Sequence, residues 1–287
     1  MKLGLSSYSL VRALRTREMT IGDVIRWTAE QGGDHIEIVP VGFAETDDFG
    51  WVEEVRTTAR ESGIEISSYT IGANFITDSP ELYEAEIERV CRQVDYAHRL
   101  GVKLMRHDVA KRPVEQTGTA SFLEDLGHLA NACERIADYA AGYGITTSVE
   151  NHGYHVQASE RVLSLLRAVN RKNFKTTLDI GNFLCVDEDP VAAVRRMIEH
   201  ASMIHLKDFY VRPSDQNPGT GWRRSITCNY LRGAIFGQGD IDVREVLRII
   251  KNSGYDGYMS IEFEGMEDCR NGSSIGMANA KRLWNEA

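Results

Sequence analysis

The stretch TTSVEN, residues 146–151, is a run rich in β-branched residues that closes on a glutamate and an asparagine. β-Branched side chains pack well on a pleated surface, so the stretch predicts a buried strand with polar residues at its C-terminal end. The same pattern, an apolar run that contains or ends in an acid or a histidine, recurs three times further along the chain: TTLDIGN (176–182), MIHLKDF (203–209) and YMSIEFEG (258–265).

Outward from this stretch, further strand-like segments alternate with amphipathic helical segments. Helix starts are indicated by Thr20 with Asp23, by the pairs Ser79-Pro80 and Asp189-Pro190, and by Ser159 with Glu160. Parallel strands require a crossover, and eight such units in 287 residues favour a closed α/β barrel, the (β/α)8 or TIM barrel. The predicted strands are residues 3–9, 35–39, 65–71, 103–109, 146–151, 174–180, 202–208 and 258–263.

The sequence contains no linker or low-complexity segment, so we expect a single catalytic barrel domain over residues 1–287. Its one long excursion is a loop at about 209–241, between the seventh strand and a helix that begins near Asp242. Long loops at this end of a barrel often cover the substrate, and we expect the same here. The GQGD segment at 237–240 is too short for a phosphate loop and predicts a tight turn.

Composition excludes several classes of protein. Lys and Arg total 33 against 42 Asp and Glu, a formal net charge of −9, which disfavours nucleic acid and anionic membranes as partners. No apolar run approaches the roughly 20 residues that a membrane span requires. The five cysteines are scattered and never form a C-x-x-C pair. We therefore expect reduced thiols and a cytoplasmic protein.

The last four predicted strands carry ionisable residues at or near their C-terminal ends: Glu150, Asp179, His205 and Glu262. In a closed barrel these ends converge on one pocket. Three carboxylates would repel one another without a cation, and three oxygen donors with one imidazole suit Mn²⁺, Mg²⁺ or Co²⁺ better than a thiolate-rich zinc site. The sequence therefore predicts one divalent metal ion with open positions for a substrate to chelate.

The motifs S-V-E-N, L-D-I-G-N, I-H-L-K-D, G-Q-G-D-I-D and Y-D-G-Y-M-S-I-E-F-E occur in this order along the chain. Their order and spacing resemble the xylose-isomerase-like superfamily of TIM-barrel sugar isomerases and epimerases over nearly the whole length. The resemblance implies a Mn²⁺-type metal on Glu150, Asp179, His205 and Glu262, and implies that the two glutamates act as acid and base. It also implies a substrate contact at Asn182.

Other residues are expected near the pocket. His152 and His155 lie in the ENHGYH loop after the fifth strand, and His152 is the best additional acid or base because imidazole titrates near neutral pH. His107 ends the fourth strand and is expected to bind substrate hydroxyls, with Arg106 pointing the opposite way. Lys207 could polarise a substrate oxygen, or pair with Asp208 at the surface. Finally, Glu37 in the second strand is expected to reach the mouth of the pocket and bind substrate.

These residues predict removal of a proton beside a sugar carbonyl through a metal-stabilised enolate. Return of the proton gives isomerisation or epimerisation, whereas loss of a β-substituent makes the protein a lyase. LKDFYVRP after His205 departs from the ketohexose epimerases and is closer to inosose dehydratases. The loop and C-terminal motifs resemble a branch proposed to act on 3-oxo-glycosides, releasing a C- or O-linked aglycone (deglycosidase activity).

Other functions and assemblies remain open at this point. An endonuclease IV-like DNA-repair enzyme shares the topology, but it needs three zinc ions, more histidines and a basic surface. A barrel that only binds a sugar would not need four intact ligands. By resemblance, the expected partners are a small sugar or glycoside, with a homo-oligomer or a complex with a small β-type subunit.

Overall fold

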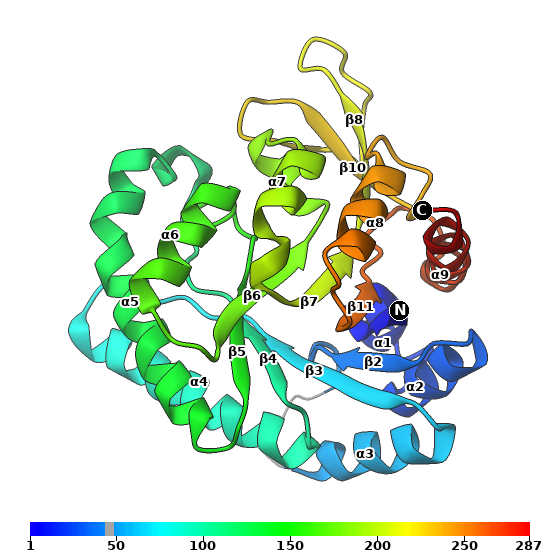
Figure 1. The fold of residues 1–287 in the computed structure, drawn as a ribbon, viewed down its shortest axis with the longest axis horizontal. Helices are drawn as coiled ribbons and strands as arrows, with labels where there is room; N and C mark the ends of the chain where they lie inside the picture. The colour runs from blue at the N-terminus through cyan, green and yellow to red at the C-terminus, as the bar shows by residue number, and fades with distance from the viewer. Residues whose placement is uncertain (44–48) are drawn as a thin grey trace.

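In a computed structural model, which describes residues 1–43 and 49–287, eight parallel strands close into a barrel surrounded by helices (Figure 1). The strands are hydrogen-bonded in the order β1-β11-β7-β6-β5-β4-β3-β2, which returns to β1. The predicted TIM barrel is therefore confirmed. The barrel strands are β1 Lys2–Ser6, β2 His35–Ile38, β3 Glu65–Ile71, β4 Leu104–His107, β5 Thr146–Glu150, β6 Phe174–Asp179, β7 Ala201–Leu206 and β11 Tyr258–Ile261.

All eight barrel strands lie where the sequence predicts them, but several end earlier. Ser7–Leu10 forms a 3-10 turn (η1) in place of the last predicted residues of β1. β11 ends at Ile261, so Glu262 lies directly after the strand and is not part of it. Strand β7 ends at Leu206, because the chain turns at Lys207 into a new strand.

The helices begin at the predicted signals. Thr20 and Asp23 form a reciprocal capping box, while Ser79 and Asp189 each cap a helix whose first residue is proline. Ser159 is the first helical residue of its helix and does not act as the cap. The α-helices are α1 Val11–Arg15, α2 Ile21–Glu30, α3 Gly50–Ser62, α4 Pro80–Leu100, α5 Thr119–Ala141, α6 Ser159–Val169, α7 Pro190–Met197, α8 Val243–Asn252 and α9 Cys269–Glu286. None of the helices in these ranges is long and apolar enough to cross a membrane.

The excursion at 209–241 contains ordered structure that the sequence did not predict. Three antiparallel strands, β8 Asp208–Arg212, β9 Arg223–Arg224 and β10 Tyr230–Ala234, form a separate sheet in the order β8-β10-β9 above the barrel (Figure 1). Asp208, the first residue of β8, ties the start of the insertion to its end, because its buried carboxylate accepts hydrogen bonds from the backbone N–H groups of Gly237 and Gly239 at 3.0 and 2.9 Å. A side chain at Gly239 would collide with that carboxylate at 2.2 Å, so the predicted GQGD turn wraps closely around Asp208.

Candidate active site

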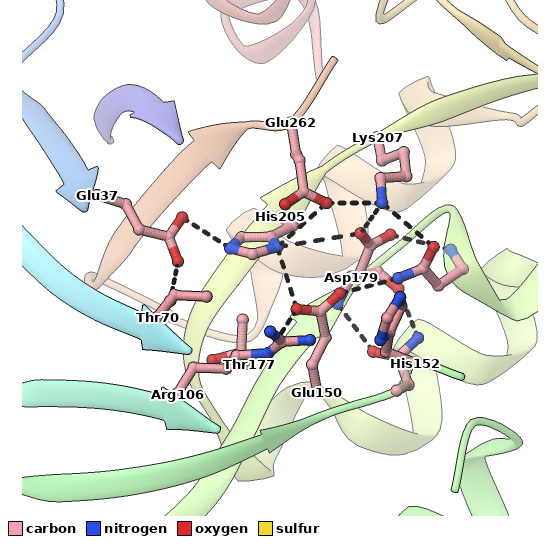
Figure 2. A network of polar contacts seen from close by, with 12 residues as sticks. Glu37, Thr70, Arg106, Glu150, His152, Thr177, Asp179, His205, Lys207 and Glu262 are labelled. Carbon is pink, nitrogen blue, oxygen red and sulfur yellow. Dashed lines mark hydrogen bonds and ion pairs between the residues drawn. The ribbon is translucent and has the colours of Figure 1, made fainter. Parts of the chain in front are cut away.

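The four predicted ligands meet at the C-terminal end of the barrel. One ligand atom from each of Glu150, Asp179, His205 and Glu262 lies within 4.8 Å of the others (Figure 2). Asp179 and His205 are fully buried, and Glu150 and Glu262 are only 4% and 8% exposed. Parallel strands that end at one rim bring together residues more than 100 positions apart in sequence. The structure thus assembles the cluster that the sequence predicted.

One atom in the cluster shows that a cation fits there. His205 Nδ1 is buried and has no hydrogen-bond partner, and it faces Glu150 Oε2 at 3.6 Å and Glu262 Oε2 at 3.7 Å. Asp179 Oδ2 lies 4.0 Å from the same nitrogen and is paired with Lys207 Nζ at 3.1 Å. Buried polar atoms are nearly always satisfied, so a nitrogen that faces three carboxylates without a hydrogen bond indicates a place for a common partner. A divalent metal ion, with its preference for oxygen and imidazole ligands, is such a partner.

Glu37 lies behind the cluster, not at the mouth of the pocket where we expected it to bind substrate. Its side chain is fully buried, with Oε2 2.8 Å from His205 Nε2 and Oε1 accepting a hydrogen bond from Thr70 at 2.5 Å. This carboxylate fixes the orientation of the imidazole, and with it the nitrogen that faces the cluster. Burial opposes the charged imidazole, but Glu37, Glu262 and Glu150 together raise the pKa of His205 to about 10.

Lys207 and Asn182 both join the cluster. Lys207 Nζ lies 2.6 Å from Glu262 Oε2 and 3.1 Å from Asp179 Oδ2, so neither the predicted pair with Asp208 nor a surface position is correct. Asn182 is buried, donates to Glu150 Oε1 at 2.8 Å and accepts from Lys207 at 3.3 Å. It therefore holds Glu150 in place. Gly181 permits this packing, because a Cβ there would approach the Lys207 carbonyl oxygen to 2.9 Å.

Strand β4 presents Arg106 to the cavity, and our assignment of His107 to substrate binding is wrong. His107 is fully buried on the helix-facing side, where its ring contacts Phe75 edge-on, and burial lowers its pKa to about 4. Adjacent residues on a strand do face opposite ways, as expected, but the inward one is the arginine. Arg106 Nε forms a 3.0 Å ion pair with Glu150.

The ENHGYH loop contributes one of its two histidines to the cavity wall. His152 lines the cavity, about half exposed, and its Nδ1 lies 3.2 Å from Asp108 Oδ1. Burial would lower the pKa of His152, but this carboxylate raises it above its ordinary value. His155 is instead fully buried and its Nε2 is 2.8 Å from Asp125, away from the cavity, so the prediction that it binds substrate is wrong.

The two glutamates of the cluster differ in charge state. Burial raises the pKa of Glu150 to about 7, with Arg106 and His205 opposing the shift. Burial acts in the same direction on Glu262, but Lys207 and His205 outweigh it and hold the pKa of Glu262 well below its ordinary value. Two carboxyl groups whose pKa values are driven apart are suited to different roles in proton transfer. Of these two glutamates, Glu262 is the one whose pKa favours the ionised form.

A cavity of about 410 Å³ opens onto the cluster. Sequence reasoning missed several of its residues: Tyr8, Trp51, Arg106, Asp108 and Glu264. Glu264 carried a signal, because it lies two positions after Glu262 on an extended segment. The residues of 209–241, all of which the structure describes, do not line this cavity, contrary to expectation. The insertion contacts its wall at Glu264, through Arg223 at 3.6 Å and through Gly233, where a Cβ would lie 2.5 Å from the Glu264 carbonyl oxygen.

Comparisons with known proteins agree with this geometry. The family model "Xylose isomerase-like TIM barrel" matches residues 25–286. An inosose dehydratase from Clostridium botulinum is 24% identical over 203 residues, which is 67% of each chain. The crystal structure of the probable 3-DHS dehydratase involved in petrobactin synthesis from Bacillus anthracis superposes with a TM-score of 0.76 at 16% identity, covering 98% of this chain and 99% of that one. A D-allulose 3-epimerase from Methylomonas sp. superposes with a TM-score of 0.73 at 18% identity, covering 99% and 98%.

Proposed function

The chain is an enzyme that belongs to the xylose isomerase-like TIM barrel family, and we propose that it removes a proton beside a carbonyl of a sugar or cyclic polyol and then expels a β-substituent. The observation that carries the proposal is the buried cluster, in which His205 Nδ1 faces three carboxylates and has no hydrogen-bond partner. Sequence relatives support the substrate class, since the similar curated proteins are named inosose dehydratases.

Glu150, Asp179, His205 and Glu262 would hold a divalent cation, which would supply electrostatic stabilisation to an oxygen that gains negative charge as the proton leaves. Three oxygen donors and one imidazole suit Mn²⁺, Mg²⁺ or Co²⁺, and the resemblance to sugar isomerases places Mn²⁺ first. Metal analysis of the purified protein, followed by reloading with each ion, tests this order.

The protein's own groups divide the remaining work. Glu262 is ionised and borders the cavity, so it accepts the proton from the carbon beside the carbonyl. Lys207, 2.6 Å from Glu262, is placed to donate a hydrogen bond to a substrate oxygen. The electron pair of the broken C–H bond first delocalises onto the carbonyl oxygen, and it forms the carbon–carbon double bond when the bond to the β-substituent breaks.

Departure of the β-substituent requires an acid, and His152 supplies one in the cavity wall. Asp108 engages its Nδ1, which leaves Nε2 as the nitrogen that can protonate a leaving oxygen. Elimination needs one base for the proton on carbon and one acid for the leaving group. Glu262 and His152 supply these two roles from the wall of one cavity.

Isomerisation or epimerisation is the second candidate. The observation that favours it is that Glu150 and Glu262, from β5 and the end of β11, both border the cavity and differ in pKa. One glutamate could then remove the proton and the other return it to the opposite face or the neighbouring carbon. The epimerase neighbour shares the fold and does not decide between the two outcomes.

Proton NMR in D₂O of the Mn²⁺-loaded protein, with free ketoses, inososes and 3-oxo-glucosides, tests the proposal. Elimination predicts an enone or its hydrate together with released water or aglycone. Deuterium beside the carbonyl with every substituent retained would instead establish isomerisation or epimerisation. No deuterium incorporation and no product from any of the three substrate classes would overturn proton abstraction as the activity.

A further inference from the structure

The insertion at 209–241 is basic, although the protein as a whole is acidic. The insertion contains four arginines and two aspartates, whereas the whole chain has a formal net charge of −9. It forms the three-stranded sheet that stands above the barrel in Figure 1. Its charged residues are Arg212, Asp215, Arg223, Arg224, Arg232 and Asp240. A local excess of positive charge on an acidic protein attracts anions to that part of the surface.

Only part of this positive charge is compensated by acids of the protein. Arg212 pairs with Asp240 at 3.0 Å, and Arg223 lies 3.6 Å from Glu264. Among the residues that the structure describes, the guanidinium of Arg232 has neither an ion pair nor a hydrogen bond, and its Nε is buried. Buried polar atoms are nearly always satisfied, so Arg232 is the arginine whose donors are available to a ligand.

Two aromatic rings hold the Arg232 guanidinium in place. The guanidinium carbon lies 4.8 Å from the ring centroid of Tyr210, which is directly opposite Arg232 on β8, and 5.2 Å from that of Trp222. Rings engage the faces of a guanidinium, whereas its N–H groups lie in its plane. The two rings therefore restrict the position of Arg232 and leave its donors free to meet oxygen acceptors.

A groove of about 280 Å³ lies at the edge of this sheet. β9 has only two residues and pairs with Tyr230 and Leu231 of β10. Beyond Leu231, the neighbour of β10 is the segment after β11, which bridges to Gly233 at Gly265. The groove lies where the one neighbour gives way to the other, and its lining includes Arg223, Arg232, Trp222, Phe209 and Glu264.

Two guanidinium groups in one groove suit a phosphoryl dianion. Each guanidinium presents paired N–H donors, and a phosphoryl group carries nearly two negative charges on three free oxygens, so it can accept from both arginines. A carboxylate offers one charge and two oxygens. Glu264 is the one acid in the lining, and its charge is shared by Arg223 and Lys207, each 3.6 Å away.

We propose that this groove, which we call the arginine groove, is a second binding site that takes a phosphoryl dianion, either as inorganic phosphate or as the phosphate group of a small ester. Among the described residues, Glu264 is the one that lines both the arginine groove and the catalytic cavity. The bound anion therefore lies beside the cavity wall but outside the cavity. No residue of the metal cluster takes part, so the proposal does not depend on the proposed function.

The test titrates inorganic phosphate and glycerol 3-phosphate into the Mg²⁺-loaded protein by calorimetry, at constant ionic strength and with sodium chloride as the blank. We expect one bound anion per chain with a dissociation constant of about 1 mM or below. Tighter binding of inorganic phosphate identifies the free ion as the ligand. Tighter binding of glycerol 3-phosphate identifies an ester, with its organic part beside Trp222 and Phe209.

Two variants remove the donors of the arginine groove, and a third is a matched control. Arg223→Leu and Arg232→Leu should each weaken phosphate binding about tenfold or more, the effect of losing charge-assisted hydrogen bonds. Arg248→Leu removes one arginine from α8, where it pairs with Glu245 one turn away, and should leave the affinity unchanged. Thermal unfolding identifies any variant that fails to fold, and either groove variant suffices for the comparison.

Lys207→Met separates the arginine groove from the catalytic cavity, which could also attract an anion. Binding that persists in Lys207→Met within about threefold and is lost in a groove variant supports the proposal. Binding that is lost in Lys207→Met but kept in both groove variants would place the anion in the cavity and overturn it. Heats equal to the chloride blank for both probes would also overturn it, as would affinities unchanged in Arg223→Leu and Arg232→Leu.

Discussion

Replacement of Glu37 by glutamine should weaken metal binding without touching a ligand. Glu37 Oε2 lies 2.8 Å from His205 Nε2, and both side chains are fully buried. The carboxylate holds the proton on Nε2 and so leaves Nδ1 free for a cation. Removal of such a partner lowers metal affinity by about 10- to 100-fold, or roughly 1.4–2.7 kcal/mol.

The contacts of Glu37 narrow the expected loss of metal affinity for two substitutions. Glu37→Gln keeps an oxygen that can accept from His205, and Thr70 can adjust its hydroxyl to the amide, so the charge is the main loss. We therefore expect about a tenfold weaker affinity for Glu37→Gln and about 100-fold for Glu37→Ala, which also frees the ring. Isothermal titration of Mn²⁺ into metal-free protein measures both.

Glu65→Gln is the matched control, because it removes one carboxylate charge at the other end of the barrel, where Glu65 pairs with the exposed Lys2. Its Mn²⁺ affinity should equal that of the wild type. Affinities of Glu37→Gln and Glu37→Ala within twofold of the wild type would refute the orienting role of Glu37. They would also place the metal elsewhere than at His205 Nδ1.

Three further predictions concern chemistry and stability. His152→Asn should slow elimination of the β-substituent by about 10²- to 10⁴-fold, because the acid for the leaving group is lost. Deuterium exchange beside the carbonyl should persist. Loss of exchange and elimination in parallel would refute a separate role for His152. Asp208→Asn should lower the free energy of unfolding by about 2 kcal/mol or more, because the carboxylate accepts backbone hydrogen bonds from Gly237 and Gly239. Urea titrations measure this loss, and an unchanged midpoint of unfolding would contradict the prediction. The pKa of His107 is lowered to about 4 by burial, so the unfolded chain binds its proton first as the pH falls, and stability drops between about pH 6.5 and 4. His107→Phe should show a smaller drop in urea titrations from pH 7.5 to 5.5 than the wild type, and an equal drop would show that this histidine does not contribute.

The barrel and its four ligands could be predicted because both depend on local patterns. Each ligand lies at or directly after a short apolar strand, and closure of the barrel alone brings such residues together. The insertion sheet could not be predicted in this way. Its strand β9 has only two residues, and the sheet depends on the turn around Asp208, a contact between residues about 30 positions apart.

The error at His107 has a physical cause, which is that strand periodicity gives alternation but not its phase. Arg106 and His107 were correctly expected to face opposite ways, yet the charged residue faces inward because Glu150 and Asp108 compensate it there. Histidine, when neutral, is more easily accommodated against Phe75. The phase of β4 therefore depends on Glu150 of β5 as well as on Asp108 directly after the strand, and the contact with Glu150 cannot be read from LMRHDV alone.

Glu37 shows a second limit of sequence reasoning. The sequence places it near the pocket, but the structure places it behind the cluster, in contact with His205 and Thr70. Alternation along β2 indicates which face of the strand Glu37 occupies, but not what lies opposite that face. Its partners follow from the pairing of β2 with β3, which shifts register between Ile36 and Glu37, and from closure of the barrel, which brings His205 of β7 across from β2. Both are relations between strands distant in sequence, so the orienting role of Glu37 could not be read from HIEI alone.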